Sequence, residues 1–215
     1  MTNIYMQTHG CSANLVESEI MMGLLSKGGF HIVDDMEYSD VNIINICTVK
    51  GPKVPLAEIS KLIEHYPEKK LIVTGCITRD IIPQIRKITQ EASLINTHNI
   101  HRITEAVEEA LNGNVLEALT QDRPIKVSLP KIRTNKVIGI IPIASGCADF
   151  CAYCSVKLIK GNIFSYPEAY IVNEVKKNID EGCREIWLTS QDNGAYGLDS
   201  GERKLNILLH AILNK

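Results

Sequence analysis

The sequence has no long apolar run, few aromatic residues and no excess of charge of one sign. Only 5% of its 215 residues are aromatic, and no window is apolar over the length needed to span a bilayer. The formal net charge of -2 gives no global basic field, so nucleic-acid binding would need a local patch or a further domain. Repeats and low-complexity tracts are also lacking. These absences favour a soluble globular protein over a membrane protein or a disordered chain.

The start of the chain also lacks the features of a secretory signal peptide. Residues 1–10 have no basic region, no apolar region and no small-residue cleavage site. We therefore expect a cytoplasmic, reducing compartment. The seven cysteines are then more typical of metal ligands or catalytic groups than of disulfides, and six of them form two triads.

Short β-rich runs alternate with helical periodicity along the first half of the chain. The predicted strands are residues 4–8, 30–33, 41–46, 71–74 and 93–96, and the predicted helices are 15–27, 56–65, 81–89 and 103–111. This alternation indicates βα units around a parallel sheet. We therefore predict an open parallel-sheet α/β domain over residues 1–120.

The second half begins after a stretch rich in proline and basic residues. We predict a linker at residues 121–136 and a second unit at 137–215. Its expected elements are strands at 137–143 and 185–189, helices at 167–179 and 205–213, and a turn-rich loop at 192–201. Two βα units cannot close a barrel of parallel strands, so we predict the start of an incomplete (βα) barrel.

Three cysteines, Cys147, Cys151 and Cys154, lie on one short loop directly after a predicted strand. This is where α/β folds place reactive groups. Three thiolates at this spacing can each bind one iron of a four-iron cubane and leave the fourth iron open. The alternative is a zinc site, but structural zinc usually requires a second pair of ligands at set spacing, and none follows here.

The other triad, Cys11, Cys47 and Cys76, is spread over the first domain. Each cysteine directly follows a predicted strand. Because the carboxyl ends of parallel strands share one edge, the three thiols could converge there on a second cluster. The alternative is three unrelated small apolar residues at strand ends, since free cysteine is commonly buried.

The loop Cys147-Ala148-Asp149-Phe150-Cys151-Ala152-Tyr153-Cys154 resembles the motif of radical S-adenosylmethionine enzymes, with Tyr153 at the aromatic position. The segments around the first triad resemble the N-terminal domain of the methylthiotransferases, which precedes a radical S-adenosylmethionine domain in that family. These segments are Thr8-His9-Gly10-Cys11 with Asn14 and Glu19, Cys47-Thr48-Val49-Lys50, and Val73-Thr74-Gly75-Cys76.

The resemblance implies two 4Fe-4S clusters, one of them auxiliary and delivering sulfur, with S-adenosyl-L-methionine as methyl donor and radical source. The segment from Cys47 and residues 187–197 look most like the archaeal and eukaryotic branch that acts on N6-threonylcarbamoyladenosine. By that resemblance the substrate is adenosine 37 of ANN-decoding tRNA and the product its 2-methylthio derivative. A complete relative continues through further βα units and an RNA-binding domain, so the resemblance implies an N-terminal piece.

The resemblance also implies contacts to S-adenosylmethionine. Gly182 and Glu185 match the place where related enzymes hold its amino group with a Gly-Gly-Glu-like segment, although one glycine is absent. Gln191 ends the same predicted strand, a favourable position for a ligand contact. Where family members usually have Arg-Gly after the cluster loop, this chain has Lys160-Gly161. We interpret Lys157, Lys160 and Arg133 as solvated surface residues.

Two other functions stay open from the sequence. The chain could be a noncatalytic iron-sulfur or zinc-binding accessory protein that binds a complete enzyme or tRNA without turnover. It could also perform the same chemistry on isopentenyladenosine or on a ribosomal-protein aspartate, as in sister branches. The sequence indicates no membrane association and names neither the electron donor nor the oligomeric state.

Overall fold

The computed structural model describes residues 1–49 and 51–214. Lys50, the last residue of the segment that begins at Cys47, lies outside them. The first half contains a six-stranded sheet in the order β2-β1-β3-β4-β5-β6, and every neighbouring pair is parallel. The strands are β1 (Asn3–Thr8), β2 (His31–Val33), β3 (Val41–Ile46), β4 (Lys70–Gly75), β5 (Ser93–Asn96) and β6 (Glu117–Ala118). The predicted open parallel sheet is confirmed.

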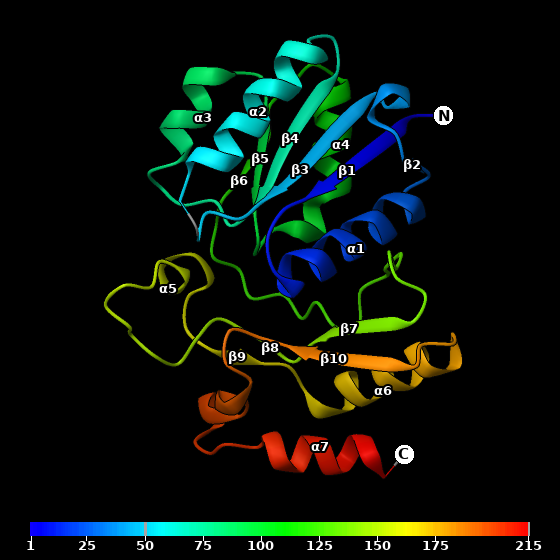
Figure 1. The fold of residues 1–215 in the computed structure, drawn as a ribbon, viewed down its shortest axis with the longest axis vertical. Helices are drawn as coiled ribbons and strands as arrows, with labels where there is room; N and C mark the ends of the chain where they lie inside the picture. Colours follow the sequence, from blue (N-terminus) through cyan, green and yellow to red (C-terminus); the bar gives the residue numbers. More distant parts are fainter. Residues whose placement is uncertain (50, 215) are drawn as a thin grey trace.

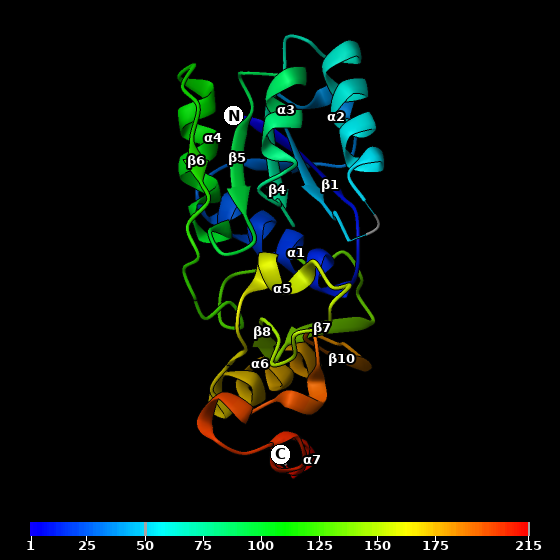
Figure 2. The same ribbon diagram turned by 90° about the vertical axis from the view of Figure 1, so that its left-hand side faces the viewer.

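Helices cover both faces of this sheet, as Figures 1 and 2 show. They are α1 (Ser12–Lys27), α2 (Lys53–His65), α3 (Ile82–Ile88) and α4 (Ile103–Leu111), with short 3-10 turns η1 (Met36–Tyr38) and η2 (Ile100–Arg102). One core cluster joins α1 and α4 to the sheet, and the other joins α2 and α3 to the opposite face. Strands buried on both sides explain the nearly continuous apolar runs of β3 and β4.

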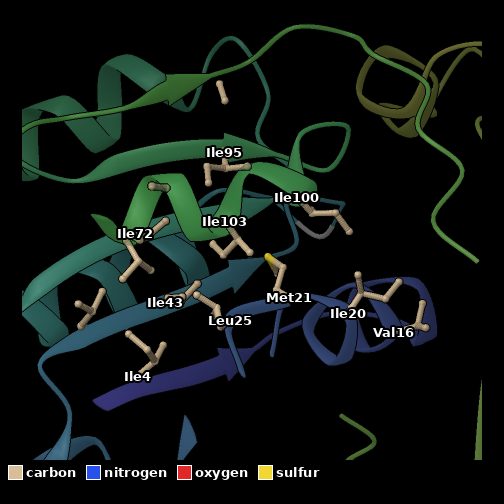
Figure 3. Packing of buried hydrophobic residues seen from close by; sticks show 14 of the residues in the cluster. Ile4, Val16, Ile20, Met21, Leu25, Ile43, Ile72, Ile95, Ile100 and Ile103 are labelled. Atoms are coloured by element: carbon tan, nitrogen blue, oxygen red, sulfur yellow. The ribbon is translucent and has the colours of Figure 1, made fainter. Parts of the chain in front are cut away.

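Alternation along the strands divides the side chains between these two cores. Ile43 and Ile72 point toward α1 and α4, where they lie near Leu25 and Ile103 (Figure 3). Ile44, the next residue of β3, packs into the core under α2 and α3. Successive side chains of a strand face opposite sides, so a single apolar run supplies both layers.

The second half contains two parallel strands, β7 (Ile138–Pro142) and β10 (Glu185–Thr189). A short antiparallel pair, β8 (Ala144–Ser145) and β9 (Phe164–Ser165), lies beside the loop that carries the second triad. The helices are α5 (Val156–Lys160), α6 (Glu168–Asp180) and α7 (Leu205–Leu213), with 3-10 turns η3 (Asn193–Ala195) and η4 (Leu198–Ser200). Their apolar side chains form a third core.

Helix α1 lies between the first sheet and the second half of the chain (Figure 1). Ile140 of β7 belongs to the same core as the α1 side chains. The main-chain N–H of Ile132 donates to the carbonyl of Glu19 on α1 at 2.9 Å. Residues 121–136 therefore pack against the first domain for part of their length. The division at residues 120 and 136 stays our prediction.

Candidate functional site

The first cysteine triad lies at the carboxyl ends of three neighbouring strands. Cys11 follows β1, Cys47 follows β3 and Cys76 follows β4, and these strands are adjacent in the sheet. Cys11 is exposed, Cys47 half-buried and Cys76 buried. The parallel topology thus brings residues 65 positions apart to one edge, as the sequence predicts.

A buried asparagine connects the thiols of this triad. Asn14, in the first turns of α1, is fully buried, and its Oδ1 lies 3.6 Å from Cys11 Sγ and 3.8 Å from Cys76 Sγ. Its Nδ2 donates to Asn45 Oδ1 and to the Ile46 carbonyl, both at 3.0 Å. Because β3 holds the amide nitrogen of Asn14, the side-chain oxygen of Asn14 is fixed toward both sulfurs.

Cys47 completes the group. A hydrogen bond with Cys47, followed by burial, raises the pKa of the Cys76 thiol. Gly10 approaches Cys47 so closely that a Cβ on it would lie 2.8 Å from the Cys47 Cβ. The three thiols of the triad therefore surround Asn14 and the turn at Gly10.

The second triad occupies one loop between β8 and α5. Cys147 and Cys154 are half-buried, whereas Cys151 is exposed. The N–H of Cys147 donates to the Gly161 carbonyl at 3.1 Å, and the N–H of Cys154 donates to the Cys151 carbonyl at 3.0 Å. Lys157 Nζ donates to the Cys147 carbonyl. The start of the loop at Cys147 is therefore bonded to α5 and to the residue after it, and the bond at Cys154 closes a turn within the loop.

The two sites face the same region between the halves of the chain. Ser12, next to Cys11, shares a 2.8 Å hydroxyl hydrogen bond with Thr189 at the carboxyl end of β10. A cleft of about 680 Å³ opens between residues that follow Cys76 and residues that follow Cys154, including Ile77, Arg79 and Leu158. The residues that directly follow Cys76 and Cys154, Ile77 and Ser155, therefore line this cleft from the two halves of the chain.

Thiolates are the usual protein ligands of iron-sulfur clusters, so the donor chemistry of both triads is compatible with such a cluster. Within residues 1–49 and 51–214, no three Cys, His, Asp or Glu side chains converge on one ion position. A cubane binds each thiolate at a different iron, so its ligands need not share one point. His9, two residues before Cys11, has a buried Nε2 without a hydrogen-bond partner in the described part of the chain. Such an atom is available to a group bound at the first triad.

The structure separates the predicted contacts to S-adenosylmethionine. Tyr153 is 91% exposed on the cysteine loop, and Gln191 lies just past the carboxyl end of β10, the end that faces the triads. Glu185 pairs with Ile138 at the opposite end of the β7-β10 pair, and Glu185 Oε1 accepts from Trp187 Nε1 at 2.6 Å. Gly182 precedes it on the surface. A strand of five residues therefore keeps Gly182 and Glu185 away from the cysteine loop, and we do not retain their assignment.

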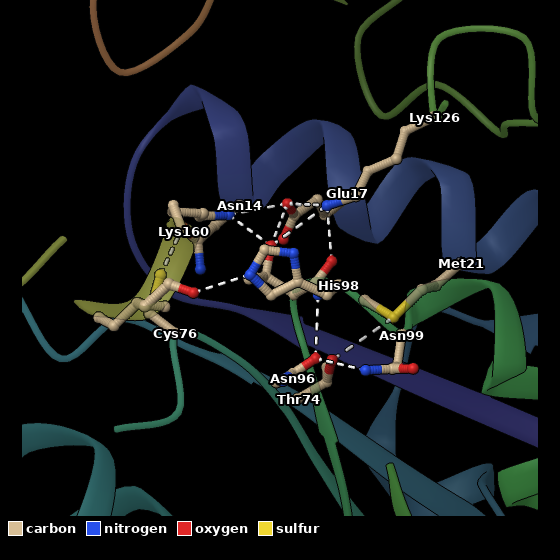
Figure 4. Close-up of polar contacts among 12 residues, drawn as sticks. Asn14, Glu17, Met21, Thr74, Cys76, Asn96, His98, Asn99, Lys126 and Lys160 are labelled. Carbon is tan, nitrogen blue, oxygen red and sulfur yellow. Dashed lines mark hydrogen bonds and ion pairs between the residues drawn. The ribbon is translucent and has the colours of Figure 1, made fainter. Parts of the chain in front are cut away.

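The sequence did not indicate a buried ionic network that lies between the triads. Glu17 Oε1 accepts from Lys126 Nζ at 2.7 Å and from Lys160 Nζ at 2.8 Å, and all three side chains are buried (Figure 4). Burial would raise the pKa of Glu17, but the charges and hydrogen bonds of the two lysines lower it to about 2. The interpretation of Lys160 as a solvated surface residue is therefore wrong.

Arg133 was also misjudged, whereas Cys183 is buried, as expected for a small apolar residue at the start of a strand. Arg133 is mostly buried and pairs with Glu181 and Asn178, so it is not a free surface cation. Cys183 is buried, and its Sγ lies 3.8 Å from Asn178 Oδ1, outside both triads. No sequence pattern marks these pairs, because their partners lie 45 or more positions away or on another element.

Fold and site together define an α/β protein with one cysteine triad at the ends of three parallel strands and a second on a single loop after β8. Residues 3–97 match the family model described as "Uncharacterized protein family UPF0004". Over 208 residues, or 95% of this chain, it is 40% identical to the probable threonylcarbamoyladenosine tRNA methylthiotransferase of Methanothermobacter thermautotrophicus. Over 92% of this chain it is 36% identical to the human threonylcarbamoyladenosine tRNA methylthiotransferase. The resemblance predicted from the sequence is confirmed.

The chain spans about half the length of the archaeal relative and 35% of the human one. Among solved structures, the radical S-adenosylmethionine methyltransferase TsrM from Kitasatospora setae, with cobalamin and a [4Fe-4S] cluster bound, matches the whole chain. The TM-score is 0.64 at 14% identity, and the match covers 53% of TsrM. This likeness supports the fold of both halves. No helix in the described ranges has the length and apolar character to cross a membrane.

Proposed function

We propose that the chain is the N-terminal part of a tRNA methylthiotransferase that converts N6-threonylcarbamoyladenosine 37 to its 2-methylthio derivative. The observation that carries the proposal is the placement of two cysteine triads at strand ends that face one region, with the relatives named for this activity. A cytoplasmic location and ANN-decoding tRNA as substrate are part of the same proposal.

The six cysteines have the central role in this proposal. When bound, a cluster on Cys147, Cys151 and Cys154 supplies an electron to S-adenosylmethionine, and one on the first triad supplies sulfur. The chain provides the thiolates, holds the loop at Cys147 through the Gly161 carbonyl, and covers Cys76 from water.

Binding of the other components follows from position. Tyr153 and Gln191 are retained as candidates for contact with S-adenosylmethionine because both lie at the triad end of β7 and β10. The cleft between the halves offers apolar side chains, such as Ile77 and Leu158, together with the guanidinium of Arg79. Such a lining suits a nucleobase whose phosphate lies near a cation.

Iron counting tests the proposal. Anaerobic reconstitution of the chain with iron and sulfide should give about eight irons per chain. Cys76→Ala and Cys147→Ala should each reduce the count to about four, since each removes one ligand of a different cluster. Cys183→Ala is the matched control, because it removes a buried thiol outside both triads, and it should keep about eight. Binding of zinc alone would contradict the proposal.

Chemistry is tested separately from cluster assembly. Addition of S-adenosylmethionine and dithionite should yield 5'-deoxyadenosine in the reconstituted chain, and Cys147→Ala should abolish it. Formation of both clusters without this product would favour the noncatalytic accessory function. In cells lacking the full gene, 2-methylthio-threonylcarbamoyladenosine should be lost from tRNA. Loss of the isopentenyladenosine derivative or of the modified ribosomal-protein aspartate instead would identify the other substrates.

A further inference from the structure

The ionic network of Glu17, Lys126 and Lys160 joins α1 of the first domain to the end of α5, the helix that follows the second triad. Lys160 ends α5, six residues after Cys154, and the next residue, Gly161, accepts the hydrogen bond of the Cys147 N–H. Its Nζ reaches across to Glu17 on α1 and to Thr97 Oγ1. Lys160 thus contacts the first domain through its side chain, and the next residue, Gly161, contacts the loop of the second triad through its main chain.

The first-domain end of this contact is adjacent to the first triad. Thr97 N–H donates to the carbonyl of Gly75, the residue before Cys76, at 3.0 Å. Glu17 lies one helical turn after Asn14, whose Oδ1 faces Cys11 and Cys76. Figure 4 shows Lys160, Asn14 and Cys76 in this group. Burial alone would lower the pKa of Lys160, but the attraction of Glu17 for the ammonium contributes to raising it, whereas burial lowers the pKa of Lys126 in the same network.

The network carries an excess of positive charge in a site closed to water. Its two lysines share one carboxylate oxygen, which gives a formal charge of +1. Lys126 Nζ also donates to the Thr97 carbonyl at 2.6 Å, so its three protons have acceptors. Burial of an uncompensated charge is costly unless a negative group lies nearby. The thiolates of a cluster on the first triad would supply that negative charge.

We propose that Lys160 is a positioning residue whose ammonium group offsets the negative charge at Cys11, Cys47 and Cys76 and raises the reduction potential of the cluster bound there. The proposal rests on the proposed function, because it requires a cluster on the first triad. It adds a link between the sites. The carbonyl of Gly161 holds the loop of the second triad, while the charge of the neighbouring Lys160 acts on the first.

A charge series in the network tests this role. The background is the chain with Cys147, Cys151 and Cys154 changed to alanine, so that one cluster is present, and alanine keeps the main-chain N–H that Gly161 accepts. Lys160→Met removes a positive charge and leaves Glu17 paired with Lys126. Glu17→Gln removes the negative charge. The measurement is the midpoint potential of the cluster from an anaerobic redox titration followed by electron paramagnetic resonance.

The expected shifts have opposite signs. Lys160→Met should lower the equilibrium constant for one-electron reduction about tenfold, which is about 59 mV. Glu17→Gln should raise it, and Lys160→Arg should stay near the parent value because the charge remains. Lys177→Met is the matched control, since Lys177 is exposed on α6, and it should leave the potential unchanged.

The outcomes separate the two proposals. If the background chain binds no cluster, the proposed function of the first triad fails. If the cluster forms and its potential is the same in Lys160→Met and Glu17→Gln, only the role of Lys160 fails. A lower unfolding temperature without a shift in potential would make the network a purely structural contact, as would loss of the fold in both variants. If only one of the two variants folds, the direction of its shift in potential still tests the proposal.

Discussion

Asn14 is the residue on which the geometry of the first triad depends most directly. Its amide bonds Asn45 and Ile46 of β3 through Nδ2 and faces two cysteine sulfurs through Oδ1. An alanine there would leave the buried Asn45 Oδ1 without a donor, whereas the Ile46 carbonyl would keep the bond from the Cys76 N–H. A buried acceptor that loses its donor destabilises the fold, because no hydrogen bond then offsets the free energy of removing it from water.

We therefore expect Asn14→Ala to lower the free energy of unfolding by about 2 kcal/mol. After reconstitution, the variant should also bind fewer irons at the first triad, while the number of irons at the second triad should not change. Urea unfolding and iron counting measure the two effects. Asn173→Ala on the exposed face of α6 is the control and should change neither. An unchanged stability in Asn14→Ala would show that the asparagine is not a structural support of the triad.

The lowered pKa of Glu17 predicts that the stability of the fold depends on pH. Its pKa is about 2 in the folded protein against 4.5 for the unperturbed group. A carboxyl whose pKa is lowered by folding contributes stability above its unfolded pKa and loses it as the pH falls through the folded pKa. The contribution should therefore disappear between about pH 4.5 and pH 2, and it is on the order of 3 kcal/mol.

Denaturant unfolding of the cluster-free chain at pH 5 and pH 2.5 measures this effect. The parent chain should lose more stability over this range than Glu17→Gln, which has no carboxyl to protonate there. Carboxylates outside the network, such as Glu58 and Glu105, titrate equally in both proteins, so the difference isolates Glu17. Equal losses would mean that the carboxyl is not held ionised by the two lysines.

At the scale of elements, the turn before the second triad depends on Gly146. Its φ is +75°, and a Cβ there would lie 2.0 Å from the carbonyl oxygen of Asn162. Cys147 follows directly and donates to Gly161. Gly146→Ala should therefore displace the start of the cysteine loop and cost more than about 2 kcal/mol, since a left-handed residue alone costs about 1 kcal/mol.

Gly201→Ala is the matched control for this prediction. Gly201 also has positive φ, at +99°, but its Cβ would meet nothing within 4 Å. Gly201→Ala should lower the free energy of unfolding by only about 1 kcal/mol and leave four irons on the second triad. Gly146→Ala should lose these irons. If both variants behaved alike, the close approach of residues 146 and 162 would not position the loop.

Long periodic elements were predictable because they carry their own pattern. The apolar run of residues 41–46 predicted β3 at its observed bounds, and the periodicity of residues 103–111 predicted α4. Short elements were missed. Helix α5 has five residues, and β6, β8 and β9 have two each, which is too short for a period to appear. These pieces form through tertiary contacts, such as the hydrogen bond that His98 Nε2 donates to the Ile159 carbonyl of α5 at 2.8 Å.

The site shows the same division. The convergence of Cys11, Cys47 and Cys76 follows from strand order, which the βα alternation predicts. The network at Glu17 does not, because Lys126 and Lys160 are 109 and 143 positions from it and no local pattern marks either lysine. Glu185 was assigned by motif likeness, and the parallel register then placed it at the far end of its strand.

At the scale of the whole molecule, α1 joins the two halves. Glu19 of α1 accepts hydrogen bonds from the N–H and hydroxyl of Thr134, both at 2.8 Å. Lys131 forms a buried ion pair with Glu174 of α6 at 2.7 Å. Residues 130–134 thus contact both halves. The contact sets where the loop of the second triad lies relative to the sheet edge that carries the first.

Gly23 permits this contact and gives a test of it. A Cβ on Gly23 would lie 2.5 Å from the main chain of Lys131 and of Pro130. In an isolated helix, glycine to alanine stabilises by about 1 kcal/mol. Here Gly23→Ala should instead destabilise, because the backbone of residues 130–131 must move away from α1 and weaken the bonds of Glu19 and Lys131.

The sign of the change decides this prediction. Gly23→Ala should lower the free energy of unfolding and speed proteolytic cleavage within residues 121–136, whereas Ser26→Ala, on the exposed face of the same helix, should do neither. A stabilised Gly23→Ala protein would mean that helix propensity outweighs the contact, so that the two halves are not held together at α1. Retained stability with faster cleavage would mean that the linker alone moves. The cysteine loops would then lose their fixed relation while each half keeps its own core.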